Sequence, residues 1–439
     1  MNQDSPQLNK GRWVQRAIDL FIPVVVLLFL EWSLTDFDWL PVNTLLGLGA
    51  GILLLTITQV VGGYGRYYDY TLAQHLKLVF QNWYLVILLL IFIAFVFAIP
   101  MEIARRVTLL WMFLTPVVIF ALKRQSRRLA IERNAKLVKV ALIGQAYEFN
   151  QSEQNYLQKK NMQIEYLKFD NVQQKVQTEL NYDIFVLNTS SNLDDSLVQQ
   201  LTELELEKGI HILTMQYFFE SYLRKCFVGF NENEITFFHD VLSLRYDQVV
   251  VKRFIDYLFA IGLSLAAFPV MLFTAFKIKK QSPGPIIFSQ ERVGLNAKEF
   301  KVYKFRSMHV DAEKGGAQFA VENDPRAYQF GGFMRKTRID ELPQLWNVIK
   351  GDLHLVGPRP ERKVFTDELE IKVPYYNERH LIRPGITGWA QVMYPYGANT
   401  EDARQKLMYD LYYIKNWSVW LEIEIILKTI LVVLGKKGL

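Results

Sequence analysis

The N-terminal part of the chain alternates long apolar runs with short polar connections. Each run approaches the roughly 20 apolar residues that an α-helix needs to cross a bilayer. The runs are residues 17–34, 42–61, 83–99 and 107–122. A buried helical bundle of a soluble protein is the alternative, but four such runs in close succession favour membrane spans. We therefore predict a four-helix transmembrane bundle, with a basic linker, over residues 1–135.

Charges between the runs predict which side of the membrane each connection faces. A basic cluster precedes the first run, and the strongly basic segment KRQSRRLAIERNAK follows the fourth. The first connection, TDFDWLP, is acidic. The positive-inside rule then places both ends of the bundle in the cytosol. The third connection carries Arg105 and Arg106 although it is expected outside, but the larger basic segment outweighs it. Asp19 and Glu31 lie near the ends of the first run, where we expect water within reach.

From residue 137 the pattern changes to short strands separated by polar segments of helical length. The strand candidates are LVKVALIG (137–144), QIEYLKF (163–169), YDIFVLN (182–188) and GIHILTM (209–215). This alternation is typical of a parallel sheet, so we predict a Rossmann-like α/β domain over residues 136–247. Gly144-Gln145-Ala146 lacks the G-x-G-x-x-G spacing that brings a pyrophosphate close to the backbone. We therefore favour a regulatory or oligomerisation domain, and hence a possible homo-oligomer, over a cofactor-binding one.

The apolar segment at 254–276 is long enough to span a bilayer but is basic at both ends. Lys-Arg precedes it at 252–253 and Lys-Ile-Lys-Lys follows it at 277–280. A simple span would carry one of these clusters outside. Pro269 lacks a backbone donor and interrupts a helix, so it supplies a break. We predict a re-entrant helix, bent at Pro269 and returning to the cytosolic face; a kinked fifth span is the alternative.

The C-terminal stretch 417–434 is apolar but contains Glu422 and Glu424. This pattern predicts a helix that lies in the membrane interface with Trp417 and Trp420 as anchors. A full span is the alternative, and the two glutamates make it the weaker one.

Composition supports a membrane protein with large cytosolic parts. The chain is 51% hydrophobic and carries a net charge of +6. Beside apolar spans, a basic balance favours anionic lipid headgroups or phosphorylated substrates as partners over nucleic acid. The one cysteine, Cys226, excludes an intrachain disulfide, and no Cys/His cluster has zinc spacing. The first apolar run leads into further runs, so we expect no cleavable signal peptide.

The candidate chemistry lies in MRKTRIDELPQLWNVIKGDLHLVGPRP, residues 334–360. Asp340 and Glu341 precede Leu342-Pro343, a pattern that predicts a helix start with Asp340 as N-cap. Capping alone is the plainer interpretation. The surrounding basic residues add a second one, because arginines bind phosphate and would keep a nucleophilic carboxylate ionised. A diphosphate substrate also calls for a divalent cation, and a carboxylate pair can help hold Mg²⁺.

Six motifs then occur in a recognisable order. They are KFRSM (304–308), NDPR (323–326), RKTRIDELPQLWNVIKGD (335–352), LVGPRP (355–360), RPGITGWAQV (383–392) and YDLYYIKN (409–416). Together they resemble the bacterial sugar transferases, the polyprenyl-phosphate hexose-1-phosphate transferases, over residues 248–439. The resemblance implies a mainly helical α+β catalytic domain that includes the re-entrant helix. The N-terminal bundle and the α/β segment resemble the larger, polytopic members, which is a looser match.

The resemblance also implies a reaction. Hexose-1-phosphate would move from a UDP-sugar to undecaprenyl phosphate and release UMP, as the first step of exopolysaccharide, capsule or O-antigen synthesis. UDP-glucose and UDP-galactose are the expected donors, ahead of N-acetylated sugars. The protein would lie in the bacterial inner membrane, in contact with the lipid bilayer, with its catalytic domain on the cytosolic face.

The family's motifs assign roles to individual residues. Asp340 falls on the position of the nucleophile, which would form an aspartyl phospho-sugar. Glu341 would assist as acid/base or, with Asp340, as a Mg²⁺ ligand. Five basic residues form the expected phosphate-binding set: Arg335, Arg359, Lys304, Arg306 and Arg383. Arg338 departs from the family, which often has serine there.

Two other classes of function stay open at this point. A membrane nucleotide-sugar oxidoreductase would use the α/β domain, but the missing glycine fingerprint speaks against it. A non-catalytic scaffold or sensor of polysaccharide assembly would not need the intact Asp340-Glu341 pair.

Overall fold

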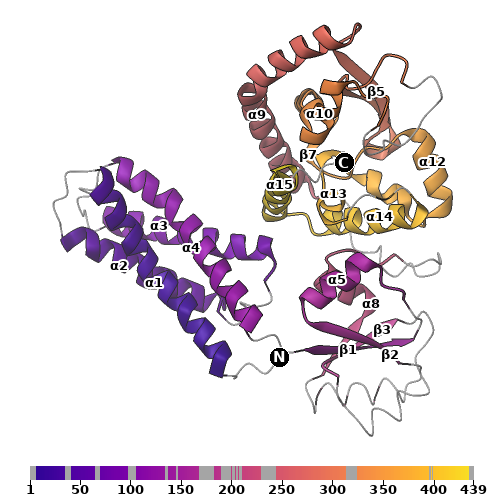
Figure 1. Ribbon diagram of the computed structural model, residues 1–439. Helices are drawn as coiled ribbons and strands as arrows, with labels where there is room; N and C mark the ends of the chain where they lie inside the picture. Colours follow the sequence, from indigo (N-terminus) through magenta and orange to yellow (C-terminus); the bar gives the residue numbers. More distant parts are fainter. Residues whose placement is uncertain are drawn as a thin grey trace. The chain divides into compact units, whose positions relative to one another are not determined.

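The structure is a computed structural model (Figure 1). It describes residues 6–34, 41–64, 70–96, 105–133, 137–144, 147–167, 182–188, 199, 203, 206, 210–228, 244–312, 324–394, 397 and 399–434. The chain divides into two compact units, Met1–Lys136 and Leu137–Leu439.

The first unit contains four helices: α1 (Pro6–Leu34), α2 (Pro41–Val60), α3 (Leu72–Val96) and α4 (Arg105–Arg133). All four contain a stretch long and apolar enough to cross a membrane, which confirms the four predicted runs. Large apolar side chains fill the space between them, with Trp83 and Trp111 in edge-to-face contact.

One expectation for this unit is wrong. Asp19 does not lie near water; its side chain is buried and pairs with Lys123 Nζ at 2.6 Å. The Tyr64 hydroxyl donates to the same carboxylate at 2.5 Å. Within an apolar bundle a carboxylate needs a partner of opposite charge, and the fourth helix supplies it.

The second unit begins with a four-stranded parallel sheet, ordered β2-β1-β3-β4. Its strands are β1 (Val138–Gly144), β2 (Met162–Leu167), β3 (Ile184–Asn188) and β4 (His211–Thr214). The predicted parallel sheet is thus confirmed. Helix α5 (Gln151–Lys159) links β1 to β2, and α8 (Met215–Phe218) and the π-turn η1 (Phe219–Leu223) follow β4. Gln145, Ala146 and Gly209 lie outside the described residues, and the Rossmann-like assignment stays a prediction.

Helix α9 (Tyr246–Gln281) contains the predicted re-entrant segment. It is one continuous helix of 36 residues with Pro269 inside it, and its two ends run in different directions in Figure 1. A proline inside a helix is the usual cause of such a bend. The helix is also the fifth that is long and apolar enough to cross a membrane. Its predicted return to the cytosolic face stays a prediction.

The rest of the second unit is mainly helical with two small sheets. Strands β5 (Ile287–Val293) and β6 (Glu299–Phe305) form an antiparallel hairpin around the short turn η3 (Leu295–Ala297), and β7 (His354–Val356) pairs in parallel with β8 (Gly385–Thr387). The helices are α10 (Gln329–Thr337), α11 (Gln344–Lys350), α12 (Lys363–Lys372), α13 (Trp389–Met393), α14 (Thr400–Lys415) and α15 (Val419–Leu434), with the 3-10 turns η4 (Ile339–Glu341) and η5 (Tyr376–Leu381).

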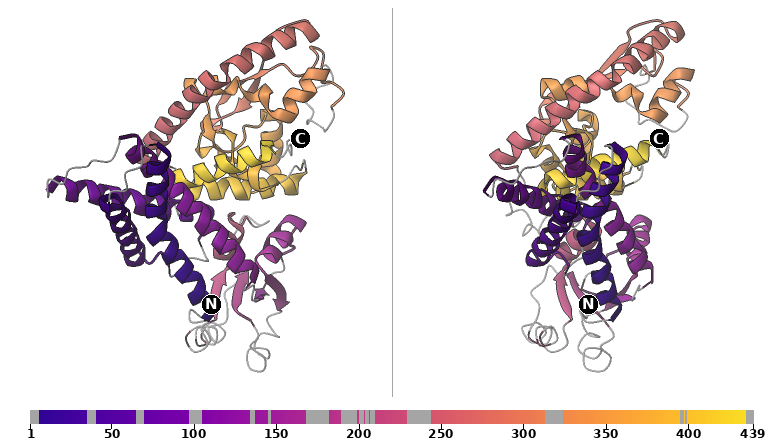
Figure 2. Two further views of the ribbon diagram at one scale, coloured as in Figure 1. Left: turned by 60° about the vertical axis from the view of Figure 1, so that its left-hand side comes forward. Right: turned by 90° about the vertical axis from the view of Figure 1, so that its left-hand side faces the viewer.

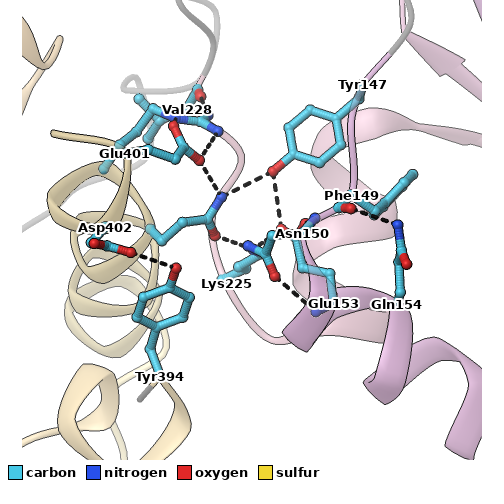
Figure 3. A network of polar contacts seen from close by, with 12 residues as sticks. Tyr147, Phe149, Asn150, Glu153, Gln154, Lys225, Val228, Tyr394, Glu401 and Asp402 are labelled. Atoms are coloured by element: carbon cyan, nitrogen blue, oxygen red, sulfur yellow. Dashed lines mark hydrogen bonds and ion pairs between the residues drawn. The ribbon is translucent and has the colours of Figure 1, made fainter. Parts of the chain in front are cut away.

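Helix α14 joins the sheet to this helical part. Its residues 407–414 are all buried. Near its N-terminal end, Gln405 accepts a hydrogen bond from Lys225 Nζ at 2.5 Å and donates one to the Tyr147 hydroxyl at 3.2 Å. Lys225 also forms an ion pair with Glu153 of α5 (Figure 3). One hydrophobic core continues across this junction, and the predicted domain boundary near residue 247 stays a prediction.

The C-terminal helix corrects another expectation. Trp417 is no interfacial anchor, because its ring is buried and its Nε1 donates to Glu422 at 2.6 Å. Glu422 and Glu424 are buried too: Glu422 pairs with Lys252 of α9, and Glu424 with Arg224 at 2.6 Å. The glutamates therefore mark the face of α15 that packs on the protein. The placement of α15 in a membrane interface stays a prediction.

Candidate active site

The Asp340-Glu341 pair lies in a tight turn between two short helices. Arg338 ends α10 by adopting the left-handed conformation, with φ of +58°. The 3-10 turn η4 follows directly, and α11 begins after Pro343. No side chain caps α11, so the prediction of Asp340 as N-cap is wrong. Leu342 and Pro343 already have helical backbone angles, which makes η4 and α11 nearly continuous and leaves the Asp340 carboxylate available for other contacts.

Glu341 is buried at the meeting point of three cationic side chains. Its Oε1 lies 3.2 Å from Lys304 Nζ, 3.3 Å from Arg359 Nη2 and 3.5 Å from Arg338 Nη1. These come from strand β6, the loop after β7 and the end of α10. Burial would raise the pKa of Glu341, but the three cations outweigh it and lower that pKa below its usual range. Glu341 is therefore an ionised acid that gathers positive charge.

Asp340 has the opposite environment although it is the adjacent residue. It is buried, and its Oδ1 has no hydrogen-bond partner among the described residues. Burial and the neighbouring Glu341 carboxylate raise the pKa of Asp340 above its usual range, against the influence of Lys304, Arg338 and Arg335. A buried carboxylate oxygen without a partner costs free energy, so it points to an interaction made only with a ligand.

Arg335 is held near the pair by an acid that the sequence did not single out. Its Nη1 lies 3.6 Å from Asp324 Oδ2, and Arg326 Nη2 lies 2.6 Å from the same oxygen. The first residue of the NDPR motif, Asn323, lies outside the described residues. Asp324 thus orients Arg335. Asp324 lies five positions before the start of α10, and nothing in the local sequence marks it as the partner of Arg335.

The loop that carries Arg359 is fixed by close backbone packing. Strand β7 includes the first two residues of the LVGPRP motif, and β8 lies within the RPGITG motif. A Cβ added at Gly385 would lie 2.1 Å from the Gly357 nitrogen, so no larger residue fits there. The glycines of the two motifs therefore let the two loops touch, and Arg359 of the first loop reaches Glu341.

Two of the predicted phosphate-binding residues contact other parts of the protein. All three nitrogen groups of Arg306 bind the turn after α9: Nε binds Pro285 O, while Nη1 and Nη2 bind Ser282 and Pro283. Burial, and to a smaller extent the nearby Arg253 of α9, lowers the pKa of Arg383. These contacts favour a structural role for Arg306 and a place beside the base of α9 for Arg383.

The fit to Mg²⁺ is different for the two acids. Among the described residues, no group of three or more His, Cys, Asp and Glu side chains is placed to hold a metal ion. Mg²⁺ often needs only one or two carboxylates together with water and substrate phosphates. The partnerless Oδ1 of Asp340 fits that role, whereas Oε1 of Glu341 already faces three cations. The contacts favour Asp340 over Glu341 as the ligand.

Comparisons with known proteins place this site in a family. The model of the family described as bacterial sugar transferase matches residues 247–436. UDP-N-acetylgalactosamine-undecaprenyl-phosphate N-acetylgalactosaminephosphotransferase of Aeromonas hydrophila is 50% identical over 188 residues, which are 43% of this chain and 44% of that protein. UDP-glucose:undecaprenyl-phosphate glucose-1-phosphate transferase of Xanthomonas campestris pv. campestris is 43% identical over 192 residues, 43% of this chain and 40% of that protein.

A shorter relative is covered over most of its length. The putative undecaprenyl-phosphate N-acetylgalactosaminyl 1-phosphate transferase of Bacillus subtilis (strain 168) is 50% identical over 138 residues, 31% of this chain and 75% of that protein. The chain belongs to the bacterial sugar transferase family. The matches to the two longer relatives span less than half of their lengths. The residues that the family model matches include nearly all of α9 and the Asp340-Glu341 turn.

Proposed function

We propose that the protein transfers a sugar-1-phosphate from a UDP-sugar to undecaprenyl phosphate, giving undecaprenyl-diphosphate-sugar and UMP. The observation that carries this proposal is the partnerless buried oxygen of Asp340 beside a glutamate that gathers Lys304, Arg338 and Arg359. The relatives' names, all undecaprenyl-phosphate sugar-phosphate transferases, supply the substrate class. The product would start an exopolysaccharide, capsule or O-antigen, on the cytosolic face of the inner membrane.

The chemistry follows in two displacements. The Asp340 carboxylate attacks the sugar-linked phosphorus, a phosphorus–oxygen bond forms, and UMP leaves with the electrons of the broken bond. An oxygen of undecaprenyl phosphate then attacks the same phosphorus and releases Asp340. UMP can depart before the second polyanion enters, so the cations around Glu341 serve each anion in turn.

The protein's other groups assist both steps. Arg359 and Lys304 neutralise phosphate oxygens, and Arg335 is held by Asp324 for the same task. Bound Mg²⁺ would neutralise further diphosphate charge, with Asp340 as its protein ligand. Glu341 keeps the cations in place and is the candidate acid/base.

Four UDP-sugars are candidate donors: UDP-glucose, UDP-galactose, UDP-N-acetylgalactosamine and UDP-N-acetylglucosamine. Sequence resemblance favoured UDP-glucose and UDP-galactose, but the two relatives at 50% identity are both named for N-acetylgalactosamine. We therefore propose a hexose or N-acetylhexosamine donor. UDP-N-acetylgalactosamine is the first to test, followed by UDP-N-acetylglucosamine.

The test is UMP release from purified protein in nanodiscs, with each of these donors and undecaprenyl phosphate. We expect turnover with at least one donor, a single equivalent of UMP per enzyme without the lipid, and loss of both signals in EDTA, restored by Mg²⁺. A ternary-complex kinetic pattern would contradict the covalent route. UMP release from none of the donors would favour a scaffold or sensor, and a tightly bound nicotinamide would favour an oxidoreductase.

A further inference from the structure

A buried arginine outside the predicted site holds the backbone of Arg359. Arg379 lies in η5, and its side chain is 6% exposed. Its Nη2 donates to the Arg359 carbonyl oxygen at 3.1 Å and lies 2.8 Å from Asp410 Oδ2. Its Nη1 donates to the Tyr376 hydroxyl at 2.7 Å. One guanidinium thus connects the loop that carries Arg359 to helix α14.

Asp410 anchors the Arg379 side chain to helix α14. It lies on the fully buried part of α14 and its side chain is 2% exposed. Burial raises the pKa of Asp410 to about 6, although Arg379 acts in the opposite direction. A buried pair of this kind is weak evidence for stability, because removing two charges from water offsets their attraction. Nε of Arg379 also has no hydrogen-bond partner among the described residues, so stability alone explains the pair poorly.

The backbone of the loop around Arg359 is restrained on both sides of that residue. Pro358 and Pro360 flank Arg359, and each has its φ angle fixed by its ring. The Pro358 carbonyl accepts from Gly385 N at 2.8 Å and the Glu361 carbonyl from Val293 N at 2.9 Å. Arg379 supplies the contact between these two. The Pro360 carbonyl also accepts from Arg292 Nη1 at 3.3 Å, so the backbone is held at each residue from 358 to 361. From this held backbone the Arg359 side chain reaches Glu341 at 3.3 Å.

We propose that Arg379 and Asp410 are positioning residues for the reaction: they touch no substrate but hold Arg359 where it meets the substrate phosphate. The role of Arg359 itself rests on the proposed function. Both residues lie in or beside family motifs, although the sequence did not single them out. Arg379 lies just before the RPGITG motif, and Asp410 is the second residue of YDLYYIKN.

The test compares Arg379→Met, Arg379→Lys and Asp410→Asn with the parent enzyme in UMP release. We expect kcat/KM for the UDP-sugar to fall about tenfold or more in Arg379→Met, mostly through KM, with partial rescue in Arg379→Lys. Arg359→Met combined with Arg379→Met should be no worse than Arg359→Met alone, because the second residue acts through the first. Additive losses would overturn the proposal. Should Arg379→Met not fold, Asp410→Asn combined with Arg359→Met carries the same expectation.

Arg404→Lys is the matched control. Arg404 is also a buried arginine, sits on α14 and pairs with Glu401 at 2.7 Å, but its backbone acceptor is Val228 rather than Arg359. We expect its effect on kcat/KM to be small and to add to that of Arg359→Met. Equal non-additivity in this control would show a general loosening of α14 and would overturn the proposal.

A second readout needs no substrate and separates this proposal from the proposed function. Amide hydrogen exchange at Gly357, Arg359 and Glu361 should become faster in Arg379→Lys and Asp410→Asn but not in Arg404→Lys. Unchanged exchange in the first two variants would overturn the positioning role. If the parent protein turns over no UDP-sugar, the proposed function fails, and the exchange result still decides what Arg379 does to the loop.

Discussion

Buried acids in residues 137–439 are paired with cations in two different ways. In the interior, three buried acids each pair with a different cation: Glu153 with Lys225, Glu424 with Arg224 and Asp410 with Arg379. In the η4 turn, three cations share one oxygen of Glu341, and an oxygen of Asp340 has no hydrogen-bond partner among the described residues. In these three pairs the charges balance, whereas in the η4 turn three cations surround two acids.

The cations of the two regions also differ in exposure. The side chain of Lys225 is 0% exposed, whereas Arg359, Arg338 and Lys304 are 34%, 27% and 24% exposed. Partly exposed cations in excess, beside a carboxylate oxygen without a partner, favour reversible binding of an anionic ligand. The two regions share burial and differ in the balance of their charges, so burial alone does not mark a site.

The largest expected effect comes from the acid in the unbalanced region. Asp340→Asn should lower UMP release roughly 1000-fold or more, as expected for loss of a covalent nucleophile. Its melting temperature should stay within a few degrees of the parent or rise, because a neutral amide replaces a buried carboxylate that lacks a partner. Incubation with the UDP-sugar should add the mass of a sugar phosphate to the Asp340 peptide of the parent only. Near-normal turnover in Asp340→Asn would remove the basis for calling this region a site.

The balanced region should respond in stability instead. Lys225→Met leaves the buried Glu153 without its cation, which typically costs about 3–5 kcal/mol of unfolding free energy. Lys225→Met with Glu153→Gln removes both charges and should recover at least half of that loss. Denaturant unfolding of both variants measures the difference. If the single and double variants lose equal stability, the charge of Lys225 does not compensate that of Glu153, and this pair is not a balanced one.

Sequence patterns captured the periodic elements and the reactive types of residue. The four apolar runs, the parallel strands and the Asp340-Glu341 pair among cations all follow from local spacing. Sequence patterns could not show where a side chain points or which distant residue it contacts. Lys252 and Glu422 are 170 residues apart, so nothing local distinguishes a paired glutamate from a break in an apolar helix.

The same limit applies within the site. Arg306 and Arg359 are both arginines in family motifs, yet one binds the backbone after α9 and the other reaches Glu341. The N-cap prediction for Asp340 failed because the pattern Asp-x-x-Pro fits a capped helix and a 3-10 turn equally well, and only the left-handed Arg338 selects the turn.

The pH dependence of turnover offers a finer test of the same imbalance. The raised pKa of Asp340 means that its reactive, ionised form is lost as the pH falls through a value above the usual range of an aspartate. We therefore expect kcat/KM to fall on the acidic side, by about tenfold per pH unit. Arg338→Ser removes a cation that lowers this pKa, so the acidic limb should move to higher pH.

Glu341→Gln should shift the limb the other way, because the neighbouring negative charge raises the pKa of Asp340. Both shifts are read from pH profiles of UMP release, each normalised to its own maximum, so that a general loss of activity does not enter. Arg245→Ser, on an exposed arginine paired with Asp247, is the control and should leave the limb in place. Shifts in the same direction for Arg338→Ser and Glu341→Gln would mean that the limb reports some other group, and Asp340 would lose its place as the titrating nucleophile.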